Sequence, residues 1–292
     1  MPATPAIGFV GFGEAAFHLS MGLRAAGAGP IHAFDIAATE IIQRRASETA
    51  TQLVASNEEL AAACSVIFAT VTSDQAPTAA RQTAPFLSTR HYYADLNSVS
   101  PAIKQSIGAT IAQTGAHFVE IAVMAPVPPY GHRVHMLLGG ESAGELMELM
   151  APYGMRMEIA SSEIGVAAAT KMFRSIVVKG LEALVTECVL GASRYGAAER
   201  VFASLAESYP GLNWPALADY MVGRVVVHGE RRAREMEEVS DTLRALGIEP
   251  IMSEATARRM DWSATLGLKA RFGGEAPRTY REVIDVVDKI GR

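Results

Sequence analysis

The chain is poor in the residues that mark several classes of protein. It has two cysteines among 292 residues, Cys64 and Cys188, and both stand in apolar surroundings far apart in the chain. This predicts buried, reduced thiols in a cytoplasmic protein rather than a disulfide. The chain has no run of about 18 apolar residues and no basic N-terminal region followed by a long apolar one. We therefore expect no membrane span and no signal peptide.

Positive charge and metal-binding patterns are also scarce. The net charge of −5 offers no electrostatic basis for binding nucleic acid or an anionic membrane. The sequence has no His-x-x-x-His or Cys-x-x-Cys pattern, so we predict no metal site. A hydrophobic content of 49% and a charged content of 20% are typical of a globular protein of one large or two ordinary domains.

The N-terminal segment carries the clearest functional pattern. An apolar run leads into Gly11-Phe12-Gly13-Glu14-Ala15-Ala16, and a helical pattern follows. Gly11 permits a tight strand-to-helix turn, Gly13 lets the backbone approach a pyrophosphate, and Ala16 lets the helix pack on the strand. Asp35 ends the next apolar run, where a carboxylate binds a ribose 2′-hydroxyl and repels a 2′-phosphate. Because none of the three residues after Asp35 is basic, the pattern predicts binding of NAD rather than NADP.

Short apolar runs alternate with helical patterns over the first half of the chain. This alternation predicts a parallel, doubly wound α/β sheet of the Rossmann type, with its ligand at the carboxyl ends of the strands. Helical periodicity dominates after Ser161–Ile164, so we expect a dinucleotide-binding domain over residues 1–162 and an all-α domain over 163–292. The expected strands span residues 7–10, 31–34, 66–71, 91–95, 118–122 and 135–138.

A long helix expected over residues 164–195 carries a polar stripe. Lys171, Ser175 and Lys179 recur every four residues, and Arg174, Glu182 and Thr186 lie near them on the helical wheel. The stripe fits either a solvated strip or the wall of a site. In a site, Lys171 would exchange a proton with a carbinol oxygen. Arg174 and Lys179 would lower the pKa of Lys171 or hold a substrate carboxylate.

Together these motifs resemble the β-hydroxyacid dehydrogenase family, which includes relatives of 3-hydroxyisobutyrate and 6-phosphogluconate dehydrogenases. The stretch from Asp95 to Pro101 resembles the family's Asp-x-Ser-Thr-x-x-Pro segment, and the stretch from Gly165 to Ser175 resembles its lysine helix. The resemblance implies that Lys171 is the catalytic lysine and that Ser98 contacts the nicotinamide half of the cofactor. Alignment with the family's Lys-Asp-Leu-x-Leu-Ala helix nominates Arg234, whereas the helical wheel favours His228 and Arg232.

The chain departs from the family at its substrate loop. Ala122-Val123-Met124-Ala125-Pro126 stands where the family usually has Pro-Val-Ser-Gly-Gly, so the usual donors to a substrate carboxylate are altered. The asparagine pair after the lysine has become Arg174 and Ser175, and Val178 replaces the glutamate that 6-phosphogluconate dehydrogenase uses to protonate its enediol. The resemblance therefore leaves the substrate open and disfavours a decarboxylating reaction.

The expected function is hydride transfer between NAD and a small hydroxy acid or its carbonyl form. The alternatives are a reductase of a larger or uncharged carbonyl compound and a dinucleotide-binding redox sensor without turnover. We also expect a homodimer formed through the helical half, because the long helix is apolar on many sides. The predicted cofactor residues are Gly11, Phe12, Gly13, Glu14, Ala15, Ala16, Asp35, Val71, Thr72, Ser98 and Arg234, and the predicted substrate residues are Asn97, Met124, Arg174, Ser175, Lys179, His228 and Arg232.

Overall fold

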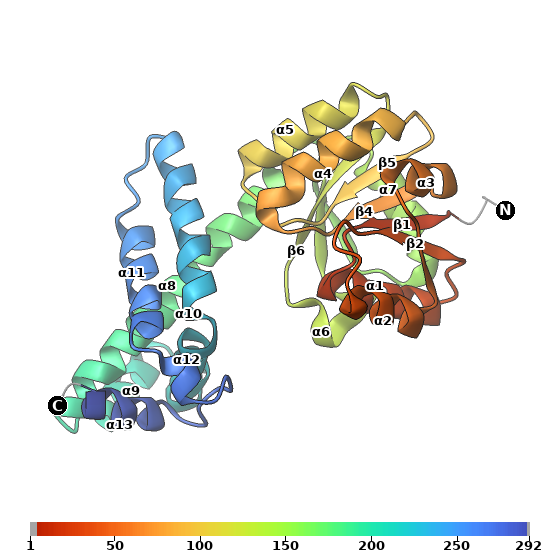
Figure 1. The fold of residues 1–292 in the computed structure, drawn as a ribbon. Coiled ribbons are helices and arrows are strands. Elements are labelled where there is room, and N and C mark those ends of the chain that lie inside the picture. The colour runs from red at the N-terminus through yellow and green to blue at the C-terminus, as the bar shows by residue number, and fades with distance from the viewer. Residues whose placement is uncertain (1–4, 291–292) are drawn as a thin grey trace. The chain divides into compact units, whose positions relative to one another are not determined.

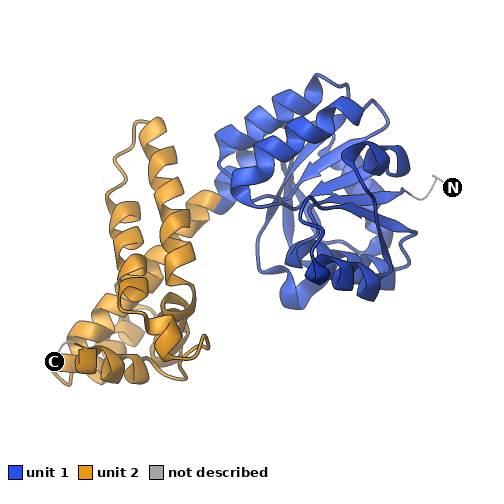
Figure 2. Cartoon of the chain, in the orientation of Figure 1, with its two compact units in different colours: residues 1–171 blue, residues 172–292 orange. Residues whose placement is uncertain are grey.

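The computed structural model describes residues 5–290, which form two compact units. Unit 1 comprises residues 1–171 and unit 2 residues 172–292 (Figure 2). The division falls inside the long helix α8 (Val166–Arg194), whereas the boundary expected from the sequence lies just before that helix.

Unit 1 is an eight-stranded sheet with the strand order β3-β2-β1-β4-β5-β6-β7-β8. Neighbouring strands are parallel except β6 and β7, which pair antiparallel. Figure 1 shows α4 and α5 on one face of the sheet and α1 and α2 on the other, the doubly wound α/β arrangement expected from the sequence. The strands are β1 (Ile7–Val10), β2 (Ile31–Phe34), β3 (Thr51–Leu53), β4 (Val66–Ala69), β5 (Tyr92–Asp95), β6 (His117–Val123), β7 (Met136–Gly139) and β8 (Met157–Ser161).

The helices of unit 1 begin where the sequence offers caps. The side chains of Thr39, Ser56 and Ser100 accept hydrogen bonds from the first turns of α2, α3 and α5. The two faces of the sheet bury separate apolar clusters, one under α1, α2 and α7 and the other under α3, α4 and α5. The helices are α1 (Glu14–Ala25), α2 (Glu40–Thr49), α3 (Asn57–Ala63), α4 (Ala76–Thr83), α5 (Pro101–Ala112), α6 (Val127–Tyr130) and α7 (Ala143–Met150).

Three features of the sheet differ from the sequence expectation. The strands β3 and β8 were not predicted, because both are edge strands whose residues are mostly exposed and lack an apolar pattern. The expectation of an all-parallel sheet was wrong at β7. The connection from β6 to β7 contains only the four-residue α6 and a short 3-10 turn, so it does not carry the chain back across the sheet.

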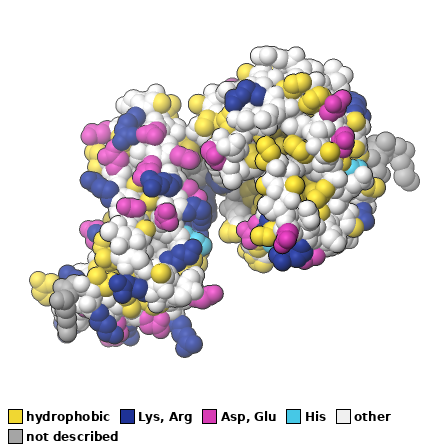
Figure 3. All heavy atoms as spheres, viewed as in Figure 1, with side chains coloured by type: hydrophobic (Ala, Val, Ile, Leu, Met, Phe, Trp, Pro, Cys, Tyr) yellow, Lys and Arg dark blue, Asp and Glu magenta, His cyan; other side chains and the backbone are white. Residues whose placement is uncertain are grey.

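Unit 2 is entirely helical in the part of the chain that the structure describes. Its largest core lies between α8, α9 (Ala198–Ser208), α10 (Trp214–Ala245) and α13 (Tyr280–Ile290), with Trp214 and Tyr280 buried in it. The remaining helices, α11 (Ile251–Thr265) and α12 (Leu268–Arg271), pack against α10. Charged side chains of both signs are mixed over the face of unit 2 drawn in Figure 3.

Candidate functional site

The glycine loop has the geometry that the sequence predicts. Gly11 has a φ of +84°, and a Cβ there would lie 2.8 Å from Val71 Cγ1 and 2.9 Å from the carbonyl oxygen of Thr70. A side chain is therefore excluded by both backbone conformation and space. Gly13 is the N-cap of α1 and receives no side-chain cap, and an added Cβ there would meet no atom within 4 Å. The loop thus leaves open space in front of the first amides of α1.

The other residues of the loop divide between core and surface. The side chains of Phe12 and Ala16 are fully buried in the core, so Phe12 can offer a ligand only its backbone. Glu14 is exposed and Ala15 half-buried at the start of α1. The loop is joined to the end of the neighbouring strand β4, because Thr70 Oγ1 donates a 2.7 Å hydrogen bond to the carbonyl oxygen of Gly11. Thr70 was not among the predicted residues, although it stands at the carboxyl end of β4.

Asp35 lies beside the glycine loop at the end of β2. Its Oδ2 accepts a 2.7 Å hydrogen bond from the backbone N–H of Phe12, and its Oδ1 accepts a 2.8 Å hydrogen bond from Ala37. These bonds fix a carboxylate next to the loop. Each oxygen keeps a lone pair that a ribose hydroxyl could use.

The loops after β4 and β5 are tied together at the same edge of the sheet. Ser73 Oγ donates a 2.8 Å hydrogen bond to the carbonyl oxygen of Ser98. Val71 is half-buried and Thr72 exposed in the first of these loops. The predicted cofactor residues Val71, Thr72 and Ser98 therefore belong to one connected rim, and Ser73 is the link that the sequence did not reveal.

A buried ion pair supports the loop after β5. Lys104 Nζ lies 2.8 Å from Asp95 Oδ2, and both side chains are almost inaccessible to solvent. Asp95 Oδ1 accepts hydrogen bonds from the backbone and side-chain amides of Asn97. Asn97 Oδ1 is buried without a hydrogen-bond partner among the described residues. Asn97 thus presents an unused acceptor next to Ser98.

Lys171 reaches this rim from the start of α8. Its Nζ donates a 2.6 Å hydrogen bond to Ser98 Oγ. Residues 73 positions apart in the chain are thereby joined within unit 1. The contact brings together two residues that the sequence analysis nominated separately.

Glu120 fixes the first turn of α8 and was not predicted. This carboxylate is fully buried in β6, and its Oε1 accepts hydrogen bonds of 2.7 and 3.0 Å from the backbone N–H groups of Gly165 and Ala167. A Cβ on Gly139, in the neighbouring strand, would lie only 2.4 Å from that oxygen. The sequence did hold a signal for this role, because Glu120 stands inside the apolar run 118–122. A carboxylate that is buried with such a run needs hydrogen-bond donors around it.

The polar stripe of α8 is largely buried within unit 2, and the reading as a solvated strip is wrong there. Lys179 is 7% exposed, and its Nζ lies 2.7 Å from Glu235 Oε2 on α10. Glu182 is 1% exposed and pairs with Arg224 and Arg232, also on α10. Burial lowers the pKa of Lys179, while Glu235 acts in the opposite direction. Lys179 and Arg232, both predicted to bind substrate, are thus engaged in ion pairs inside unit 2.

The remaining predicted residues lie in varied surroundings. Met124 is half-buried and packs near Ala167. Arg174 is exposed and Ser175 half-buried on α8. Arg234 is exposed on α10 and pairs at 3.1 Å with Glu237 of the same helix. His228 is half-buried and lines a cavity of unit 2.

His132 lies in the short turn between β6 and β7. Its side chain is buried against α1, where a Cβ on Gly22 would lie 2.0 Å from His132 Nδ1. Burial is the main cause that lowers the pKa of His132. Tyr130, in the same loop, is exposed.

The cysteines differ in burial. Burial raises the pKa of the Cys64 thiol to about 12, which keeps it protonated and unreactive at neutral pH. Cys188 is also a free cysteine but is only half-buried. The prediction of a buried thiol is thus confirmed at Cys64 and wrong at Cys188.

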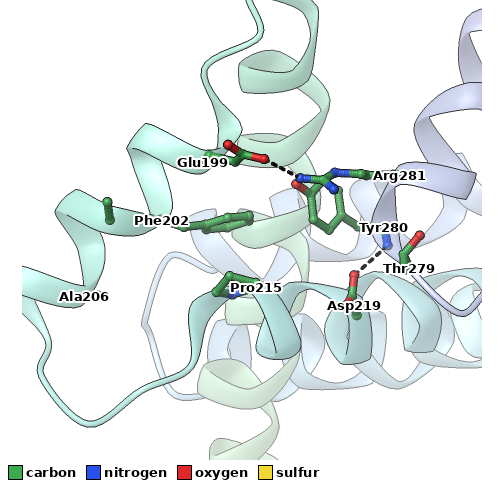
Figure 4. Close-up of a pocket in the computed structure, with 9 residues that line it drawn as sticks. Glu199, Phe202, Ala206, Pro215, Asp219, Thr279, Tyr280 and Arg281 are labelled. Carbon is green, nitrogen blue, oxygen red and sulfur yellow. Dashed lines mark hydrogen bonds and ion pairs between the residues drawn. The ribbon is translucent and has the colours of Figure 1, made fainter.

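Unit 2 also has a cavity of about 340 Å³ between α9, α10 and α13 (Figure 4). Phe202, Pro215 and Tyr280 supply apolar walls. Its carboxylates already have partners, because Asp219 accepts a 2.8 Å hydrogen bond from the N–H of Tyr280 and Glu199 pairs with Arg281 at 3.0 Å. We assign this cavity no part in the chemistry.

Residues 5–290 contain no helix with the length and apolarity needed to cross a membrane. The same residues contain no group of three or more His, Cys, Asp or Glu side chains placed to hold a metal ion.

Comparison with known proteins gives matches to both units. Residues 6–147 match the NAD binding domain of 6-phosphogluconate dehydrogenase, and residues 192–263 match a domain of unknown function (DUF1932). A conserved hypothetical protein from Sinorhizobium meliloti 1021 is 34% identical, with a TM-score of 0.84 over 99% of this chain and 97% of its own.

Two further solved structures are similar over nearly their whole length. The conserved protein MTH1747 of unknown function, which has structural similarity with 3-hydroxyacid dehydrogenases, is 31% identical, with a TM-score of 0.76 over 93% of this chain and 100% of its own. Mycobacterium tuberculosis 3-hydroxyisobutyrate dehydrogenase is 15% identical, with a TM-score of 0.75 over 97% and 99% of the two chains, and shares the fold.

The sequence and structural comparisons therefore agree with the geometry of unit 1. The glycine loop and Asp35 lie within the matched NAD-binding domain, and two relatives above 30% identity cover more than nine-tenths of the chain. The chain belongs to the β-hydroxyacid dehydrogenase-like family.

Proposed function

We propose that the protein is an NAD-dependent oxidoreductase that interconverts a small hydroxy acid and its carbonyl form, with Lys171 as the general acid–base. The observation that carries the proposal is the 2.6 Å hydrogen bond from Lys171 Nζ to Ser98 Oγ, at the sheet edge where the glycine loop also lies. Dinucleotide binding alone requires no lysine there, so this pair favours an enzyme over a redox sensor without turnover.

The residues of unit 1 fit a dinucleotide. The uncapped first turn of α1 and the open space over Gly13 suit a pyrophosphate, because free amides and the positive end of the helix dipole attract an anion. Asp35 would accept hydrogen bonds from the adenosine ribose. The unpartnered Oδ1 of Asn97 and the hydroxyl of Ser98 would face the nicotinamide half or the substrate. A bound nicotinamide accepts or supplies the hydride of the reaction.

Lys171 would handle the proton that accompanies hydride transfer. In oxidation, a neutral Lys171 Nζ takes the hydroxyl proton as the carbinol C–H bond breaks, and in reduction the ammonium returns it to the carbonyl oxygen. Ser98 Oγ accepts a hydrogen bond from Lys171 and keeps its own hydrogen for a substrate or cofactor oxygen. Ser98 would therefore orient the lysine.

A carboxylate on the substrate is supported by Arg174, an exposed cation three residues after Lys171. Fewer cations are available to bind a substrate carboxylate than the sequence indicated, because Lys179 and Arg232 already pair with acidic residues. The second candidate function is therefore a reductase of a larger or uncharged carbonyl compound. It is favoured by these ion pairs and by the apolar Met124 in the substrate loop.

The test is a screen of purified protein with matched substrate pairs. Hydroxy acids are supplied with NAD and keto or aldehyde acids with NADH, each beside its uncharged analogue, and the change in NADH absorbance is followed. We expect turnover with carboxylate-bearing compounds. Turnover confined to uncharged compounds would favour the second candidate, and a complete absence of turnover would favour the sensor.

We expect NADH to bind at least about tenfold more tightly than NADPH, because like charges about 4 Å apart near a protein surface repel by a few kcal/mol. Fluorescence titration with each cofactor measures the two dissociation constants and hence their ratio. Asp35→Asn should narrow the ratio while keeping an acceptor for the N–H of Phe12, and Asp35→Ala should narrow it too. Glu58→Gln, on α3, is the matched control. Tighter binding of NADPH by the wild type would remove this role of Asp35.

We propose a homodimer that pairs through unit 2. On α8, Lys179 and Glu182 are buried, while Val177, Leu181 and Leu184 on the opposite side of the helix are 62%, 40% and 55% exposed. Exposed apolar side chains at this spacing form a stripe that association would cover. Light scattering at micromolar concentration should give twice the chain mass, and Leu181→Glu should shift the protein toward monomer. A wild-type monomer contradicts the proposal.

A further inference from the structure

The ion pairs between α8 and α10 of unit 2 involve more cations than carboxylates. Glu182 pairs with both Arg224 and Arg232, and Glu235 pairs with both Lys179 and Arg231. Four cations therefore share two carboxylates. Arg232 is only 4% exposed, and its Nε has no hydrogen-bond partner among the described residues. The side chains of Arg231 and Arg224 are 60% and 26% exposed, so the extra positive charge lies toward solvent, where it can attract an anion.

The same face of α10 continues into a cavity of about 540 Å³, within the size range of small-molecule sites. His228 and Arg231 line it from α10, and Lys269 lines it from α12. Glu230 is the acidic residue of the lining. Glycine and alanine make up much of the remaining wall, which leaves room for a ligand: Gly229, Ala264, Gly267, Ala270 and Gly274.

The cations around this cavity act on one another. After burial, Arg224, Arg231 and Lys269 are the main causes that lower the pKa of His228. Neither His228 nor Lys269 makes a side-chain hydrogen bond or ion pair within the described part of the chain. A structural ion-pair network would have consumed these groups, so the cavity is better suited to an external anion.

We propose that this cavity of unit 2, lined by His228, Arg231 and Lys269, binds a small molecule through a phosphate or carboxylate group. Lys269 and His228 would donate hydrogen bonds directly to the anion. Arg231 would donate with the nitrogens that Glu235 does not use. The proposal does not rest on dehydrogenase activity, and it concerns unit 2 alone.

Binding can be tested on the full chain without a known substrate. Inorganic phosphate and succinate are titrated separately, with sodium chloride at equal ionic strength as the reference, and the imidazole Cε1–H signal of His228 is followed by NMR. His228 is the single histidine of residues 172–292, and His228→Gln assigns its signal. We expect a saturable shift in the millimolar range with one or both anions, and the preferred anion identifies the ligand class.

Lys269→Ala should weaken that binding by about tenfold, the loss expected for one charge-assisted hydrogen bond. Lys269→Arg should retain most of the affinity, and Lys289→Ala, an exposed lysine on α13, should leave it unchanged. Circular dichroism confirms that the variants are folded. A shift that does not saturate by 50 mM for either anion, roughly the weak limit of specific binding, or affinity that Lys269→Ala leaves unchanged, would overturn the proposal.

Discussion

Lys171→Ala should reduce turnover by about a hundredfold or more, the usual scale for loss of a general acid–base. NADH binding should stay nearly intact, because the glycine loop and Asp35 are built from other segments of unit 1. Lys171→Arg should not restore turnover, since a guanidinium keeps its proton at the pH of the assay. The measurement combines steady-state rates, on the best substrate of the screen, with a fluorescence titration of NADH.

The controls separate loss of chemistry from loss of fold. Lys289→Ala removes an exposed lysine of unit 2 and should leave both rate and NADH affinity unchanged. Wild-type turnover in either Lys171 variant would end the assignment of this residue. A loss of NADH binding in parallel with turnover would instead make Lys171 part of cofactor binding.

Glu120→Ala should destabilise unit 1 and lower turnover together. Two buried N–H groups, of Gly165 and Ala167, would lose their acceptor, and each unsatisfied group costs about 1–3 kcal/mol. These groups belong to the first turn of α8, one turn before Lys171. Displacement of a reacting group by about 1 Å can cost a hundredfold in rate. We expect a fall of about 2–5 kcal/mol in the free energy of unfolding and a rate loss of tenfold to about a hundredfold.

Glu120→Gln provides the matched comparison. It retains an oxygen at the position of Oε1, so it should lose far less stability and rate than Glu120→Ala. Thr83→Ala removes another fully buried polar group of unit 1 and tests whether loss of any buried hydrogen bond impairs turnover. Hydrogen exchange reports the mechanism directly, because the amides of Gly165 and Ala167 should exchange at least about tenfold faster in Glu120→Ala. Unchanged exchange at these amides would contradict the anchoring role.

The sequence by itself determined the fold class and the presence of a dinucleotide-binding domain. Strands in the sheet interior are apolar and strongly patterned, so β1 and β2 were predicted with their observed bounds. The glycine loop and Asp35 were also recognisable in the sequence, because this motif is defined by local backbone conformation and a fixed spacing. The edge strands β3 and β8 were missed because exposed edges do not require an apolar pattern.

The tertiary structure decided those features that depend on contacts between distant segments of the chain. Helical periodicity grouped Lys171, Ser175 and Lys179 on one face, but it could not show that Lys171 contacts Ser98 while Lys179 is buried against Glu235. Both outcomes depend on which element packs against each turn of α8. Periodicity describes the helix alone, whereas the partner of a charged side chain is set by long-range packing. For the same reason, the anchoring of α8 by Glu120 became visible only in the folded chain.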